Sequence, residues 1–166
     1  MKDEYDVVIV GAGIAGICAA YELSLKTNLK ILLLDQGRPI NSRVCPMISN
    51  KGSNCANCVS CNIMKGFGGA GNFSDGKYNF TTEFGGWLNQ YISNDEVEEL
   101  IDYVDSINMK FGATDETFST STKEAKEIER KALQNDLHLL HAKVKHLGTE
   151  NNLKILKNFF EYLNDK

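Results

Sequence analysis

Three glycines close to the N-terminus have the spacing of a dinucleotide-binding turn. Gly11, Gly13 and Gly16 follow the apolar run Val7–Val10, and apolar residues then recur at helical spacing to about Lys26. In such a turn the first glycine permits the tight bend, the second lets the backbone approach a diphosphate, and the third lets helix and strand pack closely. The diphosphate would lie against the N-terminal end of the helix, where backbone N–H groups are free.

An acidic residue completes this pattern. A second apolar run, Ile31–Leu34, ends at Asp35, nineteen residues after Gly16. A carboxylate at that point can accept hydrogen bonds from the ribose hydroxyls of adenosine, and it disfavours a 2′-phosphate. Three glycines alone would be weak evidence, but strand, turn, helix, strand and acid occur here in the expected order. The residues expected to contact the dinucleotide are Gly11, Ala12, Gly13, Ile14, Ala15, Gly16, Asp35 and Gln36.

Four cysteines lie close together in the sequence and form a candidate metal site. They are Cys45, Cys55, Cys58 and Cys61. Four thiolates can hold an iron–sulfur cluster, whose ligand spacing the last three resemble, or a zinc ion. A redox disulfide in a Cys-x-x-Cys pair and free thiols without a ligand are the alternatives that the sequence leaves open.

The elements that must position these residues begin with a strand–helix–strand unit at the N-terminus. From Gln36 to about Gly86 there is little periodicity, and glycines and both prolines gather there, which indicates a long excursion that binds something. The residues that follow are mainly helical in pattern. A capping box at Ser93 predicts a helix from about Asp95 to Met109, and further helices are expected over about 122–134 and from Thr149.

One strand is expected in this second part of the chain. Apolar and polar residues alternate from Leu140 to Lys145, so His141 and Lys145 are expected on its exposed face. His138 is likewise expected to be exposed. Trp87 is expected to pack in the core or in a lid and to have no catalytic role. The segment from Gly71 to Tyr78 nearly matches an ATP-binding loop, but a tyrosine stands where a serine or threonine must reach Mg²⁺, so an ATPase is not expected.

Composition excludes several other classes of function. The 166 residues carry a formal net charge of −4, and no basic patch is visible that could bind nucleic acid. No apolar run approaches the roughly 20 residues that a membrane span requires, and no signal peptide is visible. The sequence therefore predicts a cytoplasmic protein that binds neither nucleic acid nor membrane.

The segment from Asp6 to Gly37 is similar to the N-terminus of the glutathione-reductase-like FAD superfamily. More narrowly, Cys45-Pro46-Met47, the triplet Cys55/Cys58/Cys61, residues 66–89 and the stretch 146–149 resemble FAD-dependent dehydrogenases, also called NAD(FAD)-utilizing dehydrogenases. This resemblance implies that the glycine turn and Asp35 bind the ADP half of FAD. It also implies a phosphate or adenine contact from Arg43, and a place near the pyrophosphate or flavin for Gly68, Gly69, Ala70 and Gly71.

The resemblance also sets the expected fold and domains. We expect an α/β fold with a Rossmann-like FAD/NAD(P)-binding βαβ unit, a glycine- and cysteine-rich excursion and a mainly helical remainder. Residues 1–90 would be the N-terminal part of the FAD-binding domain, and residues 91–166 a helical segment with the start of an incomplete, substrate-side domain. Flavoproteins of this kind are longer and carry a later Gly-Asp pair that this sequence lacks, so a fragment is expected.

The expected function is the FAD-binding portion of a flavin-dependent oxidoreductase, a dehydrogenase whose substrate and catalytic residues the sequence does not reveal. Its partner would be a small molecule or an electron-transfer protein. Two alternatives stay open at this point. One is a truncated chain without activity that acts at most as a nucleotide- or metal-binding module, and the other is a nicotinamide-binding domain without flavin.

Overall fold

The computed structural model describes residues 4–50 and 54–166, and its chain divides into two compact units. The first unit contains the described residues up to Ser74 together with 149–166, and the second contains 75–148. This division falls after residues 74 and 148 rather than after residue 90, where the sequence had suggested it. The C-terminal helix therefore belongs with the N-terminal elements.

The first unit is built on the strand–helix–strand segment that the sequence predicts. Strands β1 (Val7–Val10) and β2 (Ile31–Leu34) pair in parallel, with Val7 opposite Ile31 and Val10 opposite Leu34, and helix α1 (Ile14–Lys26) connects them. Both strands and the helix have the expected bounds. A continuous apolar run of this kind is typical of a strand covered on both faces, but β1 is not, because Val8 and Val10 are 53% and 84% exposed.

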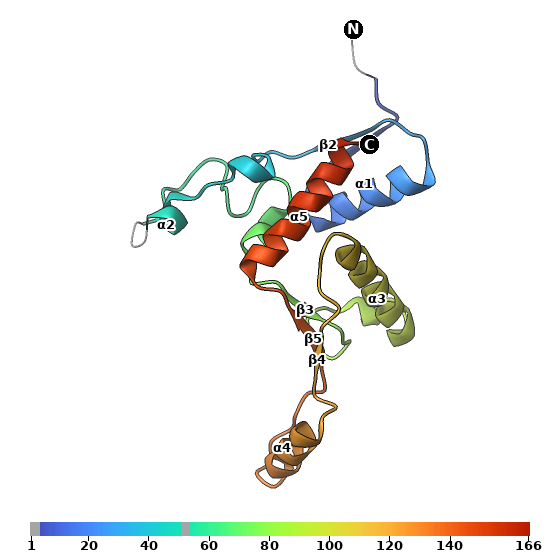
Figure 1. Cartoon of the computed structure of the whole chain (residues 1–166), viewed down its shortest axis with the longest axis vertical. Coiled ribbons are helices and arrows are strands. Elements are labelled where there is room, and N and C mark those ends of the chain that lie inside the picture. The colour runs from blue at the N-terminus through green and yellow to red at the C-terminus, as the bar shows by residue number, and fades with distance from the viewer. Residues whose placement is uncertain (1–3, 51–53) are drawn as a thin grey trace. The chain divides into compact units, whose positions relative to one another are not determined.

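Helix α5 (Thr149–Asn164) supplies the other half of the core of this unit. Its Phe159 is 1% exposed and packs edge-on against Tyr21 of α1, with the ring centroids 5.5 Å apart, and the two helices lie side by side (Figure 1). Phe160 makes a similar contact with Phe67 at 4.9 Å. Because buried aromatic pairs remove a large apolar area from water, these two contacts hold helix α5 against the N-terminal elements of the first unit.

The described residues between β2 and Ser74 are mostly irregular. They contain helix α2 (Pro46–Ser49) and two short 3-10 helices, Ile40–Ser42 and Gly69–Phe73. None of these was predicted, since pieces of three to five residues are too short to show a period.

The second unit combines a small antiparallel sheet with two helices. Strands β3 (Lys77–Asn79), β5 (Lys143–His146) and β4 (Phe118–Ser119) lie in the order β3-β5-β4. Helix α3 (Asn94–Lys110) has the predicted capping box, in which Glu96 N donates to Ser93 Oγ and Ser93 N donates to Glu96 Oε2. Helix α4 (Lys123–Leu133) is also close to its expected bounds, and a 3-10 turn covers Leu88–Gln90.

The predicted strand at 140–145 is shifted and its expected exposed face is partly wrong. It is β5, which starts at Lys143, and Lys145 is only 1% exposed. The ammonium group of Lys145 donates to both carboxylate oxygens of Asp105 on α3, at 2.8 and 2.6 Å. A lysine that is paired in this way can be buried, because the partner charge offsets the lost hydration.

Candidate functional site

The glycine turn between β1 and α1 adopts the geometry that the sequence predicts. Gly11 has a φ of +107°, a backbone conformation that favours glycine, and its N–H donates to Leu34 O at 2.7 Å. A Cβ on Gly16 would collide with the carbonyl oxygen of Gly11. These two glycines therefore serve the bend and the close packing of helix on strand.

Gly13 has a different environment from Gly16. It is the N-cap of α1, its φ is −73°, and no atom lies within 4 Å of the position that a Cβ would take. No side chain caps this end of the helix, and the first turn of α1 carries no acidic residue. A positive helix end of this kind, approachable at backbone level, suits an anionic group.

Asp35 lies directly at this turn. Its Oδ2 accepts a hydrogen bond from Ala12 N at 2.9 Å, and its Oδ1 accepts from Gly37 N at 2.8 Å and Gly66 N at 2.7 Å. Partial burial raises the pKa of this carboxyl, but the three N–H donors and the neighbouring Arg43 outweigh it, so the pKa lies below its ordinary value. The carboxylate therefore joins the glycine turn, the end of β2 and a segment some thirty residues further along the chain.

The second glycine-rich segment, Gly68–Gly71, also lies at the turn. Gly68 N donates to Ala12 O at 2.8 Å, and Gly68 has a φ of +84°. A Cβ on Gly69 would be 3.5 Å from the Cα of Gly13. The structure thus brings together the two glycine segments that the sequence proposed for the same ligand.

Arg43 is not placed as a free phosphate ligand. Its side chain is 7% exposed. The guanidinium donates to four backbone carbonyls, those of Asn62, Ile63, Phe67 and Gly69, at distances of 2.7–2.9 Å. Burial lowers the pKa of this guanidinium, and the charges of Asp35 and Cys61 partly offset that effect. Sequence reasoning missed this arrangement, because nothing in the residue pattern indicates that an arginine will bind the chain's own carbonyls.

The cysteines do not form the expected metal site. Within residues 4–50 and 54–166, no group of three or more Cys, His, Asp or Glu side chains is placed to hold a metal ion, and all five cysteines are free. The iron–sulfur or zinc centre predicted at Cys45, Cys55, Cys58 and Cys61 is therefore not supported. The physical reason is local structure: Cys45 is the N-cap of α2, whereas Cys61 begins a separate turn whose Lys65 N donates to Cys61 O.

Two cysteines have shifted acidities. Backbone N–H groups of Met64 and Ile63 lower the pKa of Cys61 below its ordinary value; burial partly opposes them, and the charges of Lys65 and Arg43 lower the pKa by smaller amounts. Burial, with the charge of Glu22, raises the pKa of Cys18, which is half-buried in α1. Cys61 is thus the more favourable thiolate of the two.

A cavity of about 780 Å³ runs beside β2 in the first unit. It reaches from the end of α1 and the start of β2 to the glycine turn and Asp35, and the aromatic rings of Phe67 and Phe160 line it. Its remaining wall comes from β2, the segment after it and the last turn of α5. The cavity is therefore continuous with the site described above.

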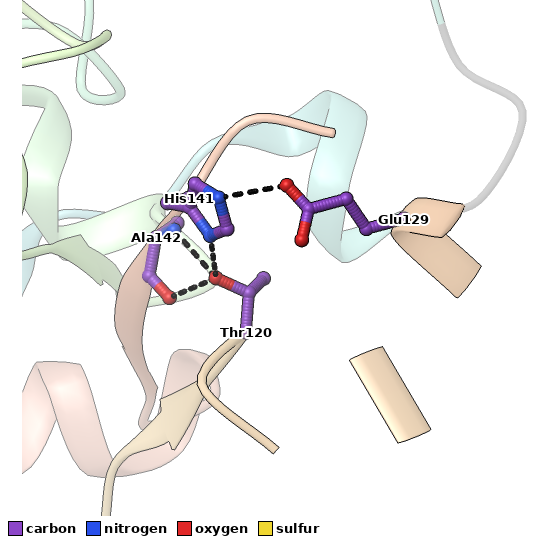
Figure 2. A network of polar contacts seen from close by, with 4 residues as sticks. All are labelled: Thr120, Glu129, His141 and Ala142. Atoms are coloured by element: carbon purple, nitrogen blue, oxygen red, sulfur yellow. Dashed lines mark hydrogen bonds and ion pairs between the residues drawn. The ribbon is translucent and has the colours of Figure 1, made fainter. Parts of the chain in front are cut away.

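The three histidines lie in the second unit, and His141 takes part in a separate polar contact there. Figure 2 shows His141 between two partners: its Nε2 is 3.0 Å from Glu129 Oε1, and its Nδ1 is 3.4 Å from Thr120 Oγ1. Thr120 Oγ1 also accepts from Ala142 N at 3.0 Å. His138 and His141 are exposed, as the sequence suggested, and His146 is exposed as well. This group ties α4 to the sheet of its own unit.

Comparison with known proteins bears on the first part of the chain. Residues 6–43 match the model of the family described as FAD dependent oxidoreductase. Hydrogen cyanide synthase subunit HcnC of Pseudomonas protegens is 48% identical over 42 residues, and the same subunit of Pseudomonas aeruginosa is 45% identical over 42 residues. The N-terminal segment is similar to FAD-dependent oxidoreductases.

Each of these two matches covers only a small part of this chain and of the relative. Each covers 25% of this chain and 10% of the relative. The family match includes β1, the glycine turn, α1, β2, Asp35 and Arg43, and it stops before the segment Gly68–Gly71. No solved structure matches the chain. Among the helices that the structure describes, none is long and apolar enough to span a membrane.

Proposed function

We propose that the first unit binds the ADP half of FAD, and that the chain is the FAD-binding portion of a flavin-dependent dehydrogenase. The observation that carries the proposal is the hydrogen bond of 2.9 Å between Ala12 N and Asp35 Oδ2. It holds the carboxylate at the amino end of α1, where a ribose and a diphosphate of one dinucleotide would have to lie together.

Each part of the ADP moiety has a candidate partner in this unit. The diphosphate would lie over Gly13, where a Cβ would meet no protein atom, and against the free N–H groups that begin α1. The ribose hydroxyls would donate to Asp35. Its Oδ2 accepts one backbone hydrogen bond, so a carboxylate oxygen retains acceptor capacity.

The glycine segment Gly68–Gly71 would border the diphosphate next to the turn. Its N–H at Gly68 holds the carbonyl of Ala12, and Gly69 approaches the backbone of Gly13. A Cβ on Gly68 would collide with Asn72 Oδ1, so this position has no room for a side chain. The proposed cofactor contacts are therefore the residues expected from the sequence, with the exception of Arg43.

The family match supports FAD rather than a nicotinamide nucleotide as the ligand. When bound, the flavin supplies the capacity to accept or donate a hydride or electrons. The residues of this chain would bind and orient the cofactor, and an acidic group at Asp35 would reject a 2′-phosphate.

A titration of the purified chain with FAD tests the proposal. Binding is followed by quenching of flavin fluorescence, and ADP serves as the competitor. We expect FAD to bind, ADP to displace it, and NADP to compete poorly because its 2′-phosphate meets Asp35. Failure of FAD and ADP to bind would refute the proposal, and binding of NAD alone would favour a nicotinamide-binding domain.

A further inference from the structure

We infer that Arg43 is a positioning residue, which holds the second glycine segment against the first without contacting the nucleotide. The inference rests on the proposed function, since it concerns how the same site is assembled. It assigns to Arg43 a role different from the phosphate contact that the sequence suggested.

The guanidinium holds both ends of one segment of the chain. Its Nε and Nη2 donate to the carbonyls of Asn62 and Ile63 at 2.9 and 2.7 Å, and its Nη1 donates to those of Phe67 and Gly69 at 2.8 and 2.7 Å. A guanidinium has five N–H donors in a rigid plane, and four of them are directed at this segment. The segment is therefore closed around the arginine as a loop.

The same loop carries the two N–H groups that reach the nucleotide site. Gly66 N donates to Asp35 Oδ1 at 2.7 Å, and Gly68 N donates to Ala12 O at 2.8 Å. Gly66 and Gly68 lie between the carbonyls of Ile63 and Gly69 that Arg43 holds. Fixing the ends of the loop thus fixes the groups that orient Asp35 and close the turn.

Three further observations indicate that the position is built for an arginine. The side chain is 7% exposed, so its charge is held away from solvent. The guanidinium carbon lies 5.3 Å from the ring centroid of Phe73, a cation–π distance. A Cβ on Gly66 would collide with Arg38 O and would lie 3.1 Å from the Cδ of Arg43, so only a glycine at this position lets the loop pack against Arg43.

The two possible roles of Arg43, direct contact with a phosphate and positioning of the loop, predict opposite results for the variant Arg43→Lys. If Arg43 bound a phosphate, Arg43→Lys would keep the charge and most of the affinity, whereas Arg43→Met would lose it. If Arg43 positions the loop, one ammonium group cannot reach four divergent carbonyls, and both variants lose affinity. Arg130→Met, on exposed α4, is the matched control.

The experiment measures FAD affinity and hydrogen exchange in the same set of proteins. We expect Arg43→Lys and Arg43→Met each to weaken FAD binding by about tenfold, the factor that corresponds to roughly one lost hydrogen bond to a charged group. In the ligand-free variants, the amides of Gly66 and Gly68 should exchange faster while those of α1 and α5 are unchanged. Arg130→Met should match the wild type in both measurements.

Two results would overturn the inference, and a third would overturn the proposed function instead. Retained affinity in Arg43→Lys with loss in Arg43→Met would mean direct phosphate contact. Unchanged exchange at Gly66 and Gly68 in both variants would mean that Arg43 does not hold the loop. Absence of FAD and ADP binding by the wild type would refute the function itself, whatever the exchange rates.

Discussion

The two glycines Gly13 and Gly16 make the sharpest prediction, because the same substitution should act on them in different ways. In Gly16→Ala, the new methyl group collides with the carbonyl oxygen of Gly11 and lies 3.1 Å from the carbonyl carbon. Both atoms belong to backbone that is fixed by the hydrogen bond between Gly11 and Leu34, so they cannot move without disturbing the sheet. Overpacking of this kind lowers the free energy of unfolding by up to about 3 kcal/mol, and the better helix propensity of alanine raises it by roughly 1 kcal/mol.

The expected net loss for Gly16→Ala is therefore about 2 kcal/mol in the stability of the first unit. In Gly13→Ala no protein atom lies within 4 Å of the new methyl group, and a φ of −73° suits alanine. The weaker N-cap and the reduced entropy of the unfolded chain nearly cancel, which leaves a change of about 0.5 kcal/mol or less. Gly13→Ala should nevertheless weaken FAD binding, because the methyl group lies where the diphosphate is proposed to approach.

Native-state hydrogen exchange of the α1 amides across a urea series measures this difference, because it reports the first unit separately from the second. We expect α1 to lose protection in Gly16→Ala and to keep it in Gly13→Ala. The reasoning would be refuted if the two variants were equally stable, or if Gly13→Ala bound FAD as tightly as the wild type while the wild type bound it well.

Four further predictions concern other parts of the chain. Asp105→Ala leaves Lys145 buried without its partner and should cost about 3 kcal/mol, whereas replacing both residues by leucine and methionine should cost much less; urea unfolding followed by tryptophan fluorescence tests this. Ser93→Ala removes the capping box of α3 and should cost about 1 kcal/mol, seen as faster amide exchange in its first turn. The pKa of Asp35 is lowered in the folded protein, so its ionised carboxylate stabilises the first unit at pH values above the ordinary carboxyl pKa, and this stabilisation is lost as the pH falls through the pKa of the folded state. Asp35→Asn should remove this part of the loss of first-unit stability in acid, which urea unfolding at several pH values would measure. Cys61, whose pKa is lowered, should be the cysteine that iodoacetamide labels first near neutral pH, which peptide mass spectrometry would show, and faster labelling of another cysteine would contradict it.

The N-terminal strand–helix–strand segment could be predicted closely because its signals are local. The apolar runs at 7–10 and 31–34, the glycine spacing and Asp35 each follow from the residues of a single short segment, and β1, α1 and β2 have the expected bounds. The capping box at Ser93 is likewise a four-residue signal, and α3 begins directly after it.

The features that sequence reasoning missed depend on contacts between distant segments. Arg43 binds carbonyls nineteen to twenty-six residues away, and Lys145 pairs with a carboxylate forty residues away. Neither contact has a period or spacing that a single sequence reveals. The predicted metal centre is not supported for a related reason: close spacing of cysteines in sequence does not by itself bring their sulfur atoms together, and Cys45 and Cys61 belong to separate local turns.

The strands β3 and β4 show the limit of pattern reading in another way. They are three and two residues long, too short for an alternation to be recognised. Lys145 of the strand between them is buried despite the alternation that placed it in solvent, and its ammonium group donates to Asp105 on α3.

The central claim is that an ADP moiety lies against the glycine turn and Asp35, next to the segment Gly68–Gly71, and an NMR titration of the labelled chain with ADP tests it most directly. We expect the largest changes in amide chemical shift at Ala12, Gly13 and Ile14 and at Gly69 and Ala70, with little change in the second unit. Saturating shifts confined to other residues, or no shifts at any concentration of ADP, would contradict the claim.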